Sequence, residues 1–160
     1  FDAIACSQMV AKRMRPITEK KNLTINIGKD DGFPDSVSTD QRAVIQILNN
    51  LLSNAAKHSD DGATIDVRWR EPDAEHFAVC VADAGAGMAP ELQKKIGDPF
   101  LHEGTYAVQP DEKGAGLGLY ICKKLMIAMG GRMDIESAVG QGTRVTMTWP
   151  ADCTGPGFAT

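Results

Sequence analysis

An amide and a cation, Asn54 and Lys57, lie three residues apart on one predicted helix, residues 46–59 (QILNNLLSNAAKHS). At ~100° per residue, one broad face of this helix is apolar: Val44, Ile47, Leu48, Leu51, Leu52 and Ala55. A polar stripe follows the border of that face: Gln46, Asn50, Asn54 and Lys57. We expect the Asn54 amide to be half-buried and to need a partner, because an unpaired buried amide costs ~1–3 kcal/mol. The amide can supply oxygen to a metal ion and the lysine can bind a phosphate, but a core helix with a polar flank fits the segment equally well.

A carboxylate, Asp83, follows an alternating apolar segment. Its parity matches that of Phe77, Val79 and Val81, so we expect its side chain to point to the core side at the end of a strand. A charge there is costly unless a donor faces it, and the Gly-Ala-Gly that follows allows a ligand to come close to the backbone. The exocyclic amine of adenine is a suitable donor. A carboxylate that caps the next turn is the alternative interpretation.

A glycine-rich run, residues 114–119 (GAGLGL), leads directly into an apolar helix. Backbone N–H groups at a helix N-terminus favour an anion such as phosphate. Two familiar nucleotide motifs fail on spacing. The fingerprint GxGxxG has Pro90 in place of its third glycine after Gly85 and Leu119 in that place after Gly114, and no GK[ST] of a P-loop occurs in the chain.

Periodicity and turn residues place these motifs on helices and strands. We expect these elements in chain order: helix 2–20 with a kink at Arg15-Pro16, strand 23–27, a helix capped by Ser38, Thr39 or Asp40 and ending at 59–62, strands 65–69 and 76–82, a short helix from Pro90, a loop 97–116, helix 117–129, and strands 133–136 and 143–149 joined by 140–142. A loop of that length in a compact domain is usually a lid or binding loop. This order predicts an α/β (α+β) two-layer sandwich, in which about three helices cover one face of a mixed, mostly antiparallel sheet of about five strands.

Composition narrows the class of protein. The chain has 160 residues, which suits one domain, and a net charge of −4 without a Lys/Arg cluster, which argues against nucleic-acid binding. The four cysteines show no CxxC spacing, so we expect neither a disulfide framework nor a zinc site, and we expect Cys80 and Cys122 to be small buried hydrophobes. No signal peptide and no apolar run of membrane-spanning length is present. The chain begins at Phe1 without Met, so we interpret it as a piece of a longer protein.

Five motifs together resemble the boxes of the catalytic and ATP-binding (HATPase) domain of bacterial two-component sensor histidine kinases, in the GHKL superfamily shared with gyrase and MutL ATPases. The boxes are, in chain order, residues 50–57 (NLLSNAAK, N box), 83–87 (DAGAG, G1 box), 98–100 (DPF, end of the F box), 114–119 (GAGLGL, G2 box) and 140–143 (GQGT). Each box alone is weak evidence for this family, but all five boxes in this order are highly specific to it. The resemblance covers residues 1–150.

The resemblance implies a site for ATP and Mg²⁺. It implies that Asp83 binds the adenine amino group and that Thr143 supports the adenine pocket. It also implies that Asn54 holds Mg²⁺, that Lys57 faces the phosphates and that His58 contacts the nucleotide. The other nucleotide-binding positions that it implies are Gly85, Gly87, Phe100, Lys113, Gly114, Gly116, Leu117, Gly118 and Leu119.

Residues 97–113 correspond to the family's lid over ATP, from which Lys113 or His102 is expected to reach the γ-phosphate. The resemblance implies that the catalytic residues are Lys57 and Asn50. Asn50 occupies the position where hydrolytic members of the superfamily carry a glutamate base. An amide cannot take a proton at neutral pH, so the sequence resembles a kinase and not a gyrase-like ATPase. The chain departs from the family at Gly97, where the F box usually begins with an aromatic residue.

The resemblance implies transfer of the γ-phosphate to a histidine on a separate helical dimerisation domain, upstream and absent from this chain. His58, His76 and His102 do not replace that histidine. Residues 1–150 would form the catalytic domain and residues 151–160 a disordered tail. The expected partners are that upstream domain and a response regulator receiver domain, with no nucleic acid or membrane contact. We expect a cytoplasmic location, a dimer in the full-length protein and a monomer for this piece. A degenerate nucleotide-sensing or docking module without phosphotransfer is the alternative.

Overall fold

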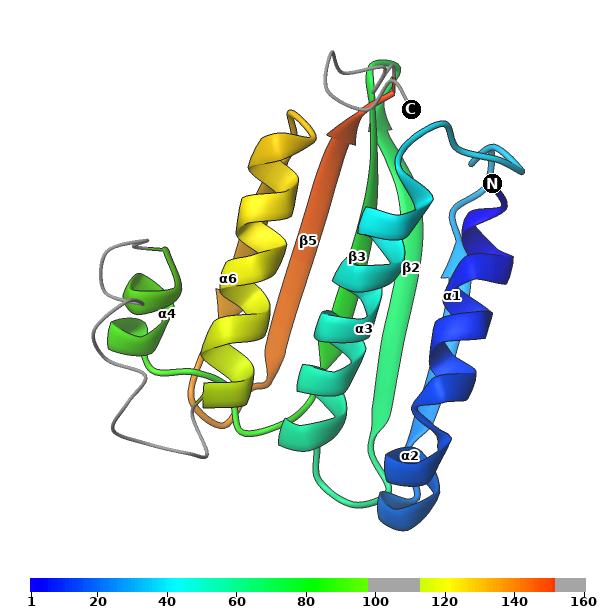
Figure 1. Ribbon diagram of the computed structural model, residues 1–160. Coiled ribbons are helices and arrows are strands. Elements are labelled where there is room, and N and C mark those ends of the chain that lie inside the picture. The colour runs from blue at the N-terminus through cyan, green and yellow to red at the C-terminus, as the bar shows by residue number, and fades with distance from the viewer. Residues whose placement is uncertain (98–112, 152–160) are drawn as a thin grey trace.

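Five strands form one sheet in the computed structural model, which describes residues 1–97 and 113–151 (Figure 1). The strands are β1 (Thr24–Lys29), β2 (Thr64–Asp73), β3 (His76–Asp83), β4 (Arg132–Ser137) and β5 (Thr143–Pro150). Their order in the sheet is β1-β2-β3-β5-β4. β1 pairs with β2 in parallel, and every other neighbouring pair is antiparallel. The sheet is therefore mixed and mostly antiparallel, as predicted.

Helices cover one face of this sheet. The described helices are α1 (Ala3–Arg13), α2 (Arg15–Lys21), α3 (Gln41–His58), α4 (Pro90–Gly97) and α6 (Lys113–Ala128). Figure 1 shows the three long helices, α1, α3 and α6, side by side in front of the strands, while α4 lies beside α6. The two-layer sandwich that the sequence predicted is confirmed.

Short polar residues set the helix boundaries. The carboxylate of Asp2 accepts hydrogen bonds from two backbone N–H groups at the start of α1, and Asp40 does the same for α3. The first helical segment breaks at Met14, next to the predicted kink, and Pro16 lies in the first turn of α2, where a missing N–H costs nothing. Asn22 ends α2 in the left-handed conformation, with φ 53°.

The apolar face predicted for α3 forms the centre of the core. All six of its residues are buried: Val44, Ile47, Leu48, Leu51, Leu52 and Ala55. From the sheet, Trp69 stacks on Trp149 with ring centroids 6.0 Å apart, and the Trp69 indole N–H donates to Ser7 Oγ in α1 at 2.9 Å. This packing fixes α1 and α3 against the strands that carry the candidate site.

Two predictions differ from the structure. Helix α6 begins at Lys113, four residues before the predicted start at Leu117. Glycine disfavours helix, yet Gly114 and Gly116 lie in the first turns of α6, and this helix packs along α3, so tertiary packing overrides propensity. Cys80 is half-exposed and not buried, because its side chain alternates away from the helix-covered face, whereas Cys122 is buried as predicted.

Candidate functional site

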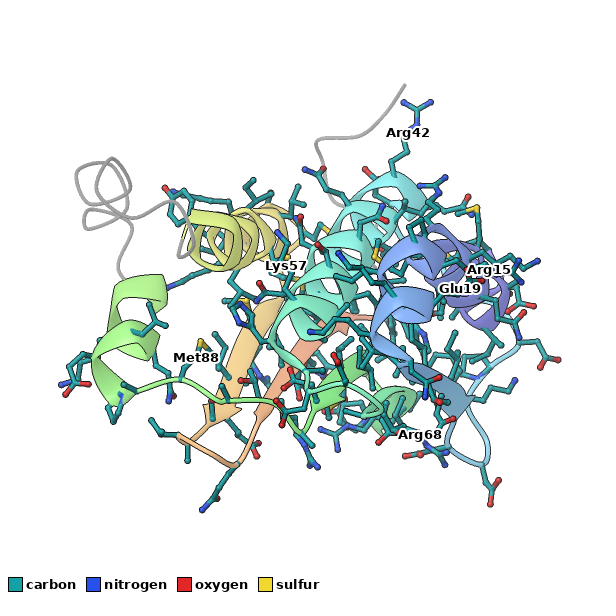
Figure 2. All side chains as sticks on the ribbon, turned by 90° about the horizontal axis from the view of Figure 1, so that it is seen from below. Arg15, Glu19, Arg42, Lys57, Arg68 and Met88 are labelled. Atoms are coloured by element: carbon teal, nitrogen blue, oxygen red, sulfur yellow. The ribbon has the colours of Figure 1, made fainter. Side chains whose placement is uncertain are left out.

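The predicted site residues converge at one end of the sheet. In Figure 1, the C-terminus of α3, the end of β3, the loop from β3 to α4, the start of α6 and the β4–β5 turn all lie at the lower end of the molecule. Figure 2 looks at this end from below and shows Lys57 at the end of α3 and Met88 in the loop towards α4. Segments distant in sequence therefore meet here.

The polar stripe of α3 runs towards this end. Asn50 and Asn54 are half-buried, as expected for the border of the apolar face, whereas Lys57 and His58 are exposed on the last turn. Along the stripe, solvent exposure thus increases from the half-buried amides to the exposed ammonium group of Lys57. This arrangement suits a ligand that is polar and anionic at one end.

Asp83 is a half-buried carboxylate at the end of β3. Burial raises its pKa, and three smaller effects oppose this increase: hydrogen bonds from the backbone N–H groups of Gly85 and Thr143, and the charge of His58. The Gly85 N–H donates to Oδ1 at 2.9 Å. The carboxylate is therefore held in a fixed orientation at an energetic cost, which is typical of a functional group.

The loop after Asp83 packs directly on the end of α3. A Cβ at Gly85 would lie 2.1 Å from the His58 carbonyl oxygen, and the Ala86 N–H approaches the same oxygen at 3.4 Å. Only a residue without a side chain permits this contact between two main chains. The contact brings Asp83 and the polar stripe of α3 into one site.

The β4–β5 turn supports the same loop from its other side. Gly87 and Gly142 have positive φ (70° and 79°), and a Cβ on Gly142 would lie 2.1 Å from the Asp83 carbonyl oxygen. Ser137 Oγ accepts from the Met88 N–H at 2.8 Å and lies 2.9 Å from Thr143 Oγ1. Thr143 is therefore fixed beside Asp83, because the two residues pair between β3 and β5.

Asn50 lies between α3 and α6. Its side chain lies close to Gly118 of α6, and burial raises the pKa of the Cys122 thiol in that helix to about 12. Among the described residues, its amide nitrogen is buried and has no hydrogen-bond partner. A buried, unpaired donor next to a predicted phosphate site is either a cost of ~1–3 kcal/mol or a group kept for a ligand.

The glycine-rich motif contributes backbone from α6. Residues 113–118 form the first turns of this helix, so N–H groups at its start lack partners within the helix, as expected for an anion site. Leu119 is only 1% exposed and belongs to the hydrophobic core, which leaves it little surface to offer a nucleotide. Phe100 and His102 lie outside the described residues, as does nearly all of the predicted lid.

An open cavity of about 440 Å³ lies at this end of the sheet. Asp83 and Thr143 contribute to its lining, but so do Ala82, Glu136 and Arg144, which alternate to the opposite face of the sheet. The cavity therefore curves around the strand ends towards the uncovered face. Asp83 thus borders both this cavity and the loop that packs on the end of α3.

The described residues hold no cluster of three His, Cys, Asp or Glu side chains that would bind a metal by themselves. A metal at Asn54 would therefore need oxygen ligands from a bound molecule, as Mg²⁺ commonly takes from phosphates. In the part of the chain that the structure describes, no helix has both the length and the apolar character needed to cross a membrane.

Sequence reasoning missed the residues that support the site. Lys21 donates to the end of α3 from α2, and Gln93 in α4 donates to the carbonyl oxygens of Met88 and Ser137 at 3.0 and 2.9 Å. These contacts join residues 5 to 44 positions apart. Nothing in the local sequence marks them, since a lysine or glutamine in a helix usually faces solvent.

This fold and this arrangement of boxes define a class of nucleotide-associated domain, and the comparison with known families agrees. Residues 39–152 match the family described as histidine kinase-, DNA gyrase B-, and HSP90-like ATPase. The chain belongs to this family, and its curated relatives are sensor histidine kinases.

Three similar proteins illustrate the relationship. The chain is 34% identical over 136 residues to the sensor histidine kinase RcsC of Salmonella typhimurium, and this alignment covers 84% of this chain and 14% of RcsC. Full-length ShkA, solved in complex with AMPPNP, has a TM-score of 0.78 at 30% identity over 94% of this chain and 30% of that one. ThkA, solved in complex with response regulator protein TrrA, shares the fold, with a TM-score of 0.74 at 22% identity over 96% of this chain and 41% of that one. The chain thus spans about a seventh of the length of RcsC.

Proposed function

We propose that this domain binds ATP with Mg²⁺ and presents the γ-phosphate to a histidine on a separate helical domain. The observation that supports the proposal is the direct packing of the Asp83–Gly87 loop on His58 at the end of α3, which brings a half-buried carboxylate to the end of the helix that carries Asn54 and Lys57. A base-recognising group and a phosphate-recognising group then share one site.

The residues present fit such a ligand. A glycine with no room for a Cβ lies beside Asp83, and a buried amide nitrogen at Asn50 lacks a partner among the described residues. Half-buried Asn54 offers an amide oxygen, a ligand type that Mg²⁺ accepts together with phosphate oxygens. The ShkA structure with AMPPNP supports the proposal by likeness.

In this proposal five residues of the site have defined roles. Asp83 accepts the adenine amino group, and Thr143 holds the carboxylate through its backbone N–H. Lys57, exposed and near the end of α3, neutralises phosphate charge, and Asn54 holds the metal, which would supply charge neutralisation at the phosphates. Asn50 cannot act as a base for water, which favours transfer to an imidazole that is already nucleophilic.

The proposal extends to the protein from which this domain derives. We propose that residues 1–150 are the catalytic domain, that an upstream helical domain dimerises and carries the acceptor histidine, and that a response regulator receives the phosphoryl group. ThkA in complex with its response regulator is consistent with this assignment. We further propose a cytoplasmic location and a monomeric state for this piece.

The test is phosphotransfer in trans. The chain is mixed with γ-labelled ATP, Mg²⁺ and the helical acceptor domain of a sensor kinase, and labelled phosphohistidine is measured beside Lys57→Ala. The proposal predicts label on the acceptor with the unchanged chain and a strong loss with Lys57→Ala. Nucleotide binding without any phosphohistidine would favour a sensing or docking module instead, and steady phosphate release without an acceptor would favour an ATPase.

A further inference from the structure

Lys21, the last residue of α2, reaches across to the end of α3. Its ammonium group donates to three backbone carbonyl oxygens, those of Ala56 at 2.8 Å, Lys57 at 3.2 Å and Ser59 at 2.5 Å. The side chain is half-buried, so the contact is partly shielded from water. All three donors of the ammonium group are thus used on one helix terminus.

The chemistry of a helix end explains this contact. The last four carbonyl groups of an α-helix have no partner within the helix and carry the negative end of its dipole. A cation with three hydrogen-bond donors satisfies both needs at once. The basic residues in the last turn of α3 itself, Lys57 and His58, are exposed, so Lys21 supplies the cap from another element.

The main chain reinforces the same junction. The Lys21 carbonyl oxygen accepts from the Gly62 N–H at 2.8 Å, and the Thr24 N–H donates to the Ala63 carbonyl oxygen at 3.1 Å. The turn after α3 is therefore tied to the α2–β1 connection at two further points. Lys21 thus contacts this turn through both its side chain and its backbone.

The junction lies directly behind the candidate site. The carbonyl groups of Lys57 and Ser59, which Lys21 binds, flank His58, and the His58 carbonyl oxygen is the surface on which Gly85 and Ala86 pack. A shift of the end of α3 would therefore move Lys57 and the loop after Asp83 together.

We propose that Lys21 is a positioning residue for the nucleotide site. It fixes the end of α3, which carries Asn54 and Lys57, and the surface against which the loop after Asp83 rests. This inference depends on the nucleotide binding proposed above. Lys21 itself acts only through the main chain of α3.

The first test measures nucleotide affinity well below the melting temperature. We compare the unchanged chain with Lys21→Met and with Lys20→Met, a control that removes the same charge from an exposed residue of the same helix. Disturbed support of a metal-binding group typically costs tenfold or more, so we expect the Kd for an ATP analogue with Mg²⁺ to rise about tenfold in Lys21→Met. Lys20→Met should bind like the unchanged chain, and Lys21→Arg should recover most of the loss.

Hydrogen exchange without nucleotide provides the second readout. In Lys21→Met we expect faster exchange at the amides of Ser59, Gly62 and Ala86, with the amides of β5 unchanged. Lys21→Gln replaces Lys21→Met if the latter does not fold.

Two results would overturn the inference. If the unchanged chain binds the analogue and Lys21→Met binds it equally well, Lys21 only stabilises the fold. If the unchanged chain does not bind the analogue at all, the proposed function fails, and the inference fails with it.

Discussion

Gly85→Ala is the substitution whose effect the structure defines most closely. An added Cβ would lie 2.1 Å from the His58 carbonyl oxygen, 2.8 Å from the His58 carbonyl carbon and 3.0 Å from Asp83 Oδ1. Ordinary contact begins near 3.4 Å, so the two main chains must separate by 1.3 Å (3.4 − 2.1). Neither backbone segment can rotate away as a flexible side chain would.

This separation should affect both stability and binding. Overpacking of this kind costs ~1–3 kcal/mol, and each kcal/mol lowers the melting temperature of a domain of this size by ~2–4 °C, so we expect a decrease of about 2–12 °C. Asp83 would also move relative to the end of α3. Because a misplacement of ~1 Å can cost about 100-fold in an aligned site, we expect nucleotide affinity to fall by at least about tenfold.

Thermal melting followed by circular dichroism and a nucleotide titration provide the assay. Gly28→Ala is the matched control, because its Cβ would meet only the tip of the Arg68 side chain, 3.1 Å away, which can move. The Arg68–Asp30 ion pair that it would disturb is exposed and contributes little. If Gly85→Ala melts and binds like the unchanged chain, the close packing of this loop on α3 is not a property of the protein in solution.

Three further predictions concern single side chains. Burial raises the pKa of the Asp83 carboxyl above its value of about 3.8 in the unfolded chain, so the folded chain binds the carboxyl proton more tightly. The stability that this proton contributes is fully present below pH 3.8 and is lost as the pH rises through the pKa of Asp83 in the folded chain. Asp83→Asn should therefore melt above the unchanged chain at pH 7, by a margin that shrinks on acidification, and a margin independent of pH would contradict this reasoning. Ser7→Ala removes the partner of the buried Trp69 indole and should lower the free energy of unfolding in a urea titration by ~1–3 kcal/mol, whereas exposed Ser36→Ala should not change it. Asn50→Leu removes a buried unpaired donor and should raise the melting temperature, and a decrease would mean that the amide has a partner in solution.

The sequence predicted those features that depend on local pattern. Spacing alone identified the buried face of α3 and the half-buried Asn54, because helical periodicity fixes which side chains share a face. Strand parity placed Asp83 at the end of β3, and Pro16 marked the break between α1 and α2. Each of these inferences uses residues within one element.

Features that depend on distant contacts could not be predicted. The parallel pairing of β1 with β2 and the three bonds from Lys21 arise only when segments more than 30 residues apart meet. The predicted start of α6 was wrong because glycine has a low helix propensity, which the packing of α6 along α3 overrides.

A calorimetric titration with a non-hydrolysable ATP analogue measures whether this domain binds a nucleotide through Asp83. It compares the unchanged chain with and without Mg²⁺, and beside Asp83→Asn. We predict saturable binding that weakens without Mg²⁺ and collapses in Asp83→Asn, although that variant remains folded and melts at a higher temperature. Absence of binding in every condition, or equal binding by Asp83→Asn, would contradict it.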